Sequence, residues 1–139
     1  MKRLMFLLLL FHVSILQADI AIVVPVNSPI NTLSKKEVSN LFLSRTNRLE
    51  NGKKAILIEI RDYRLRDTFY RLISSKTPTQ LKYYWTTLIF SGKGKPPRSF
   101  SSKENMIDYM KRHTTAISYL DSSDITPDMK EVLRFPAPE

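Results

Sequence analysis

The sequence predicts an α/β domain in which short apolar strands alternate with amphipathic helices. Three apolar runs have the length of buried strands, and they span residues 20–24, 55–60 and 116–120. Between them lie segments whose apolar residues recur at helical spacing, such as Leu65, Phe69 and Leu72. Because strands that alternate with helices favour parallel neighbours, we expect a mixed, mostly parallel sheet flanked by helices.

The first strand and the first helix carry the clearest local signals. Residues 20–24 form a continuous apolar run that Pro25 closes, which is typical of a strand buried in a parallel sheet. Ser34 and Glu37 are spaced as a capping box, in which each side chain accepts a hydrogen bond from the other residue's backbone N–H. We therefore expect a helix that starts after Ser34 and runs to about Leu43.

The later elements are predicted from spacing and from turn residues. Asn51-Gly52 marks a turn before the second strand, and three helices are expected after that strand, near residues 65–73, 78–88 and 101–110. Pro78 suits the first turn of the second of these helices, and Ser101 with Glu104 is spaced as a capping box for the third. For the C-terminal tail the sequence allows two predictions: a strand at residues 132–135, or a short helix that begins at Pro127.

A cluster of aromatic residues lies in the expected helix near residues 78–88. Tyr83, Tyr84 and Trp85 are consecutive, and their spacing relative to Leu81 and Leu88 favours a role in the core and in an interface on one helix face. Stacking on a base or a sugar is the alternative. No RNA-binding sheet motif accompanies these residues.

The N-terminal segment has the layout of a cleaved secretory signal peptide. Two basic residues precede an almost wholly apolar run over residues 4–16, and Ala18 supplies the small residue before a cut. The run is shorter than the roughly 20 residues that span a membrane. We therefore expect a signal peptide at residues 1–18, a domain at residues 19–139 and a periplasmic location. An uncleaved anchor or a buried helix is the alternative.

The composition narrows the chemistry that the chain can perform. Without Lys2 and Arg3 the basic residues fall from 22 to 20, against 13 acidic residues, so the processed chain has a net charge of +7. This charge favours anionic partners, although scattered basic residues also fit plain solubility. The chain has no Cys, and after processing its only His is His113, at the polar end of an expected helix. We therefore expect that the chain is not an enzyme and that it has neither a metal site nor a cofactor.

Two segments follow strands at positions where open α/β sheets bind ligands. Asn27 and Ser28 come after the first strand, whereas Arg61, Arg64 and Arg66 come after the second strand and open a helix. A helix N-terminus favours an anion, and guanidinium groups suit phosphate or carboxylate. We predict that these five residues bind a small anion. The alternative is that the arginines are solvated or pair with nearby carboxylates, namely those of Glu59, Asp62 and Asp67.

Several stretches of the chain match one family in their order and spacing. They are residues 20–24 with 27–30, 33–43, 58–61 with 66–70, 84–85 with 89–97, and 116–119. Together they resemble the phosphate-binding-protein-like family of periplasmic solute receptors, which have the type II periplasmic-binding-protein fold. Receptors of this family have two lobes and run to roughly twice the size of this domain. The resemblance therefore implies a single lobe of that fold.

The resemblance also implies a ligand and partners. Arg61 matches the arginine of the family's phosphate cradle, but Tyr63-Arg64-Leu65 stands where the family has small hydroxyl residues, and Ser118 replaces a glycine. The implied function is binding of phosphate or a similar oxyanion in an ABC transport or sensing system, with a membrane transporter or sensor protein as partner. The alternative is a ligand-free module that docks on such a membrane protein. A homodimer is left open, and export argues against a nucleic-acid partner.

Overall fold

The computed structural model describes residues 18–137, so the predicted signal peptide lies, apart from Ala18, outside the described residues. The strands are β1 Ile20–Pro25, β2 Ile56–Ile60, β3 Arg98–Phe100, β4 Ala116–Asp121 and β5 Met129–Phe135. The helices are α1 Lys35–Phe42, α2 Tyr63–Ser74, α3 Pro78–Phe90 and α4 Lys103–Lys111, with a 3-10 turn at Ser122–Asp124. Within residues 18–137, no helix has the length and apolar character needed to cross a membrane.

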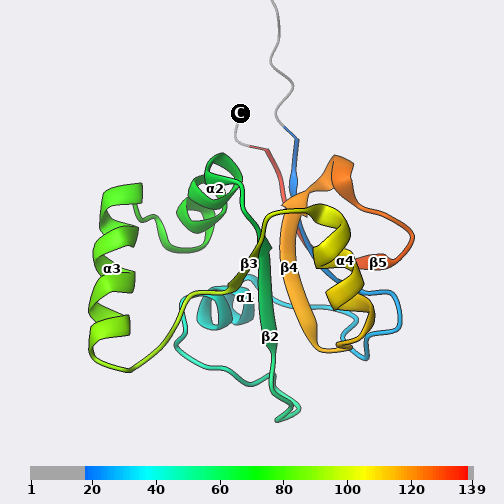
Figure 1. The fold of residues 1–139 in the computed structure, drawn as a ribbon, viewed down its shortest axis with the longest axis horizontal. Helices are drawn as coiled ribbons and strands as arrows, with labels where there is room; N and C mark the ends of the chain where they lie inside the picture. Colours follow the sequence, from blue (N-terminus) through cyan, green and yellow to red (C-terminus); the bar gives the residue numbers. More distant parts are fainter. Residues whose placement is uncertain (1–17, 138–139) are drawn as a thin grey trace, which may run out of the picture.

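The strands form one five-stranded sheet in the order β3-β2-β4-β1-β5 (Figure 1). β2 is parallel to β3 and β4, whereas β1 is antiparallel to both of its neighbours. Four strands therefore share one direction, which confirms the mixed, mostly parallel sheet. The expectation that β1 has parallel neighbours is wrong. Its continuous apolar run arises because both faces of the strand are buried, and burial does not depend on strand direction.

Helices cover both faces of the sheet, with α1, α2 and α3 on one side and α4 on the other (Figure 1). The larger core includes an aromatic group in which the rings of Phe69 and Tyr119 stack at 3.9 Å and Phe42 meets both edge-on. On the other face, Met106 and Met110 of α4 belong to a second buried cluster. The core thus has two layers, as expected for a sheet buried on both faces.

Most helix starts agree with the sequence predictions. Ser34 and Glu37 form the predicted capping box of α1, with bonds of 3.1 Å and 2.7 Å to each other's backbone. Pro78 occupies the first turn of α3. The prediction for α4 is wrong by one residue: Ser102 is the cap, and its hydroxyl accepts a bond from Asn105. The reason is that the backbone stays extended at Ser102, with φ −129° and ψ 143°, so the first helical residue is Lys103. The short strand β3, which precedes this turn, was not predicted.

The structure decides between the alternatives for the tail and shows where the residues of the aromatic cluster lie. The tail forms a strand, β5, rather than a helix, and it pairs with β1 along the far edge of the sheet. Trp85 is buried, and the half-buried Tyr84 donates a hydrogen bond of 2.6 Å to the carbonyl of Leu43. Tyr83 is 75% exposed. The cluster is therefore divided between the core and the surface of the helix.

Candidate anion site

Both described ends of the chain lie at one end of the sheet, the end at which β2 finishes and Arg61 follows. Ile20 at the start of β1 pairs with Asp121 at the end of β4 and with Phe135 at the end of β5. Because β2 runs parallel to β4, its last residue leads to Arg61 at this same end (Figure 1). The predicted arginines therefore lie where the chain enters and leaves the domain.

The structure does not bring Asn27 and Ser28 to the arginines. These residues follow Pro25, which pairs with Met129 at the start of β5, so they lie at the opposite end of the sheet. Ser28 is buried there, where its hydroxyl accepts a bond from the N–H of Ile30. The physical reason is the direction of β1: it runs antiparallel to the other strands, so the residues that follow it emerge at the opposite end of the sheet from those that follow β2.

A small cavity of about 140 Å³ lies at the end of β2. It is lined by Glu59, Ile60, Arg61, Asp62, Tyr63, Arg66 and Ser99. Arg61 and Arg66 thus line the cavity, whereas the exposed Arg64 does not. Within the described residues, none of the three arginines forms an ion pair with a carboxylate. Of the predicted alternatives, pairing with the neighbouring carboxylates is not what the structure shows, whereas Arg61 and Arg64 are exposed, as solvated side chains would be.

Arg66 contributes a buried donor that has no partner. Its Nε atom is buried and makes no hydrogen bond, and its guanidinium lies 5.8 Å from the centre of the Tyr70 ring. Buried polar groups are nearly always hydrogen-bonded, and leaving one unpaired costs about 1–3 kcal/mol. Arg66, which lines the cavity at the end of β2, therefore keeps one N–H donor unused.

A buried carboxylate forms part of the same cavity wall. Glu59 is only 5% exposed, and it accepts hydrogen bonds from Tyr119 at 2.5 Å and from Ser99 at 2.8 Å. Burial, and then the charge of Glu59, raises the pKa of the Tyr119 phenol well above its usual range. Sequence reasoning did not assign this role to Glu59. The available signal was a single acidic residue within an otherwise apolar strand.

The N-terminus of α2 already has a negative group of its own. Asp62 is the N-cap residue, and its Oδ1 accepts a bond of 3.1 Å from the N–H of Leu65. The N–H of Arg61 donates to Phe100, and that of Asp62 donates to Ile60. The N–H groups of Arg61, Asp62 and Leu65 are therefore occupied, and the guanidinium groups of Arg61 and Arg66 are the charged donors that line the cavity.

The ring contacts of His113 within the described residues are with Tyr109 of the preceding helix turn. His113 lies just beyond α4, where its ring stacks on Tyr109 at 3.9 Å and its Nδ1 is 2.8 Å from the Tyr109 carbonyl oxygen. Across residues 18–137, no group of three or more His, Asp or Glu side chains is placed to hold a metal ion.

Comparison with known proteins finds similarity in structure but not in sequence. No family model matches the chain, and no curated protein matches its sequence. A candidate phosphate ABC transporter substrate-binding protein from Clostridium perfringens, solved with bound phosphate, matches 83% of this chain with a TM-score of 0.62 and 13% identity. The fold is that of one lobe of a type II periplasmic binding protein.

Two further structures support this fold. An ABC-type phosphate transport receptor from Vibrio cholerae matches with a TM-score of 0.53 and 12% identity. A candidate phosphate-binding protein from Planctomyces limnophilus matches with a TM-score of 0.58 and 11% identity. Each of these two also covers 83% of this chain. In turn, this chain spans 44%, 45% and 40% of the three proteins, which is less than half of each.

Proposed function

We propose that this chain is a periplasmic binding module that holds phosphate or a similar small oxyanion between Arg61 and Arg66. The observation that carries the proposal is the cavity at the end of β2, which is lined by two arginines without ion pairs and beside which the Nε of Arg66 has no partner. The cavity volume of about 140 Å³ lies below the roughly 300 Å³ at which pockets for drug-sized ligands begin. Its size therefore favours a small ion.

A second wall for the cavity would have to be added at this same end of the sheet, where Arg61 lies. Both described chain ends emerge there, and a single lobe encloses an ion from one side only. We propose that residues 1–18 are removed on export and that residues 19–139 form the working domain. The second wall would come from a membrane transporter or sensor, or from a second copy of the chain. Similarity to phosphate transport receptors supports a role in transport or sensing.

The test is calorimetric titration of phosphate into the full chain after export and purification from the periplasm. We expect saturable binding that is lost in Arg61→Ala and in Arg66→Ala. Arg64→Ala is the matched control, because Arg64 is exposed and does not line the cavity. Mass spectrometry of the same sample shows whether the chain begins at Asp19. A folded protein that gives no heat up to millimolar phosphate contradicts the proposal.

A second candidate function is a ligand-free module that docks on a membrane transporter or signalling protein. The observation that favours it is the pair of carboxylates at the cavity, since Asp62 caps α2 and Glu59 is held by Tyr119. Both groups repel an anion. This candidate predicts no phosphate binding, together with loss of partner association when Arg61 is replaced.

A further inference from the structure

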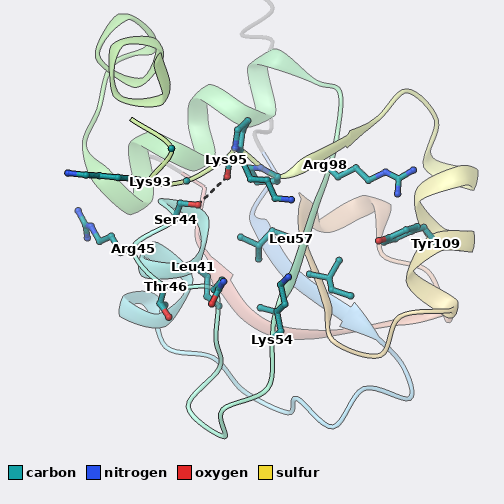
Figure 2. Close-up of a pocket in the computed structure, with 17 residues that line it drawn as sticks. Leu41, Ser44, Arg45, Thr46, Lys54, Leu57, Lys93, Lys95, Arg98 and Tyr109 are labelled. Atoms are coloured by element: carbon teal, nitrogen blue, oxygen red, sulfur yellow. Dashed lines mark hydrogen bonds between the residues drawn. The ribbon is translucent and has the colours of Figure 1, made fainter. Parts of the chain in front are cut away.

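A second and much larger hollow lies at the beginning of β2 (Figure 2). We call it the basic groove; its volume is about 1120 Å³. Three segments form it: residues 44–47 after α1, residues 54–57 at the start of β2, and residues 92–98 leading into β3. Tyr109 of α4 closes one end. The basic groove shares no residue with the cavity at Arg61 and lies at the opposite end of β2.

The charge of the basic groove has a single sign. It is lined by five basic residues, Arg45, Lys54, Lys93, Lys95 and Arg98, and by no carboxylate. Among the described residues, none of these five side chains forms an ion pair. In Figure 2, Lys95 and Lys54 lie on either side of Leu57, and Arg98 extends toward Tyr109, with its guanidinium 4.8 Å from the ring centre. Positive charge gathered in a concave surface attracts an anionic partner.

The floor of the basic groove is an unfinished sheet edge. β3 pairs with residues Ile58–Ile60 only. The N–H of Ala55 donates to Asn47 and that of Ile56 donates to Thr115 on the β4 side, so Leu57 is the residue that presents an open N–H beside the start of β3. The segment that faces Ile56 and Leu57 contains Pro96 and Pro97, whose backbones have no N–H to donate. An open edge beside apolar side chains is a template for an added strand.

The wall opposite β2 is held in place by close packing. Gly94 lies so near the turn after α1 and the helix α3 that an added Cβ would be 2.8 Å from the Cβ of Ser44 and 2.9 Å from Leu88 Cδ2. The Ser44 hydroxyl donates a hydrogen bond of 3.1 Å to the Lys95 carbonyl. The basic groove is therefore a built feature of the fold rather than a gap beside a loose loop.

We propose that the basic groove binds an extended acidic segment of a partner protein. Such a segment would accept a hydrogen bond from the Leu57 N–H and extend the sheet beside the start of β3. Successive residues of a strand point to opposite faces of the sheet, so every second, acidic residue would lie among the basic side chains that line the groove, and the apolar residues between them would lie on the other face. An inorganic polyanion would use the charge but not the edge or the floor. The proposal does not depend on phosphate binding at Arg61.

The test uses a fluorescein-labelled synthetic peptide of alternating Glu and Val, titrated into the full chain purified from the periplasm. In Lys54→Ala/Lys95→Ala we expect the affinity to fall by about tenfold, since two cations are removed from the contact. The matched control is Lys35→Ala/Lys36→Ala, which removes the same charge from exposed positions on α1 outside the basic groove. This control should bind as the unaltered chain does.

A second measurement separates strand addition from simple charge attraction. Hydrogen exchange followed by NMR should show slower exchange of the Leu57 N–H when the peptide is bound. Equal loss of affinity in both double variants, or unchanged exchange at Leu57, would overturn the proposal. Inorganic polyphosphate is titrated in parallel. If it binds in a manner that depends on Lys54 and Lys95 while the peptide does not bind, the occupant is an inorganic polyanion and the proposal is wrong.

Discussion

The phenol of Tyr119 in β4 donates a hydrogen bond to the carboxylate of Glu59 in the neighbouring strand β2. Both side chains are buried, and the Tyr119 ring stacks on Phe69 of α2. A single polar contact thus links the sheet core to the cavity at Arg61. The consequence is that changes to this pair should affect both stability and the shape of the cavity.

Replacement of Tyr119 by Phe should reduce the free energy of unfolding by about 1–3 kcal/mol, because it removes a donor from a buried carboxylate. The stacked ring is retained, so the loss reports on the hydrogen bond. Urea denaturation followed by circular dichroism measures it. Tyr83→Phe is the control, since Tyr83 is 75% exposed, and it should change stability little. Equal effects of the two substitutions would argue against the role of the Glu59 contact.

Stability should fall above about pH 10. Burial, and then the charge of Glu59, raises the pKa of both Tyr70 and Tyr119 well above the ordinary value of 10.0. A pKa that is higher in the folded state means that the stabilisation is present below the unfolded value and is lost as pH rises beyond it. Each phenol should lower the free energy of unfolding by about 1.4 kcal/mol per pH unit there. Urea denaturation between about pH 9 and pH 11 measures this slope, which should be shallower in Tyr119→Phe.

Replacement of Ser75 by Gly should stabilise the protein by about 0.5–1 kcal/mol, because Ser75 ends α2 in the left-handed conformation with a φ of 57°. The side chain is exposed, so little contact is lost. Ser91→Gly is the matched control, since Ser91 ends α3 with a φ of −84° and should gain nothing. Thermal denaturation of both variants measures the difference, and a gain in Ser91→Gly as large as in Ser75→Gly would contradict this explanation.

Replacement of Asp62 by Asn should strengthen phosphate binding by about fivefold, because it removes a negative charge from the cavity wall and keeps an effective helix cap. Calorimetric titration of phosphate measures the change. Asp67→Asn removes the same charge from α2 outside the cavity and should have a smaller effect. A weaker affinity in Asp62→Asn than in the unaltered chain would mean that Asp62 supports the site.

Replacement of Gly94 by Ala should lower stability by about 1–3 kcal/mol, since the added methyl overlaps Ser44 and Leu88. Ser44→Gly should partly restore stability in the Gly94→Ala background, because it removes the nearer obstacle. Urea denaturation of the two single variants and the double variant gives the coupling energy. Strictly additive effects would mean that the methyl is accommodated without contact with Ser44.

Local sequence signals predicted most elements because the interactions behind them span only a few residues. The capping box at Ser34 and the Pro at position 78 start helices by bonds and backbone angles within one turn. β3 was not predicted, because three largely exposed residues carry no pattern, and they form a strand only by pairing with Ile58–Ile60.

The candidate site was predictable only in part. Arg61 and Arg66 were expected from their position after a strand, and both line the cavity. Ser99 and Tyr119 join Glu59 from strands about 40 and 60 positions away in the sequence, so no local spacing could have indicated their contact.

The sequence by itself determined the α/β class, the apolar strands, the main helix starts and a basic chain without cysteine. Those properties depend on the spacing and chemistry of neighbouring residues. Only the tertiary structure decided the direction of β1, and with it the separation of Asn27 and Ser28 from the arginines. It also decided that five basic residues from three distant segments line one groove. Strand direction and long-range contacts depend on how the elements pack together, and no short stretch of sequence determines that packing.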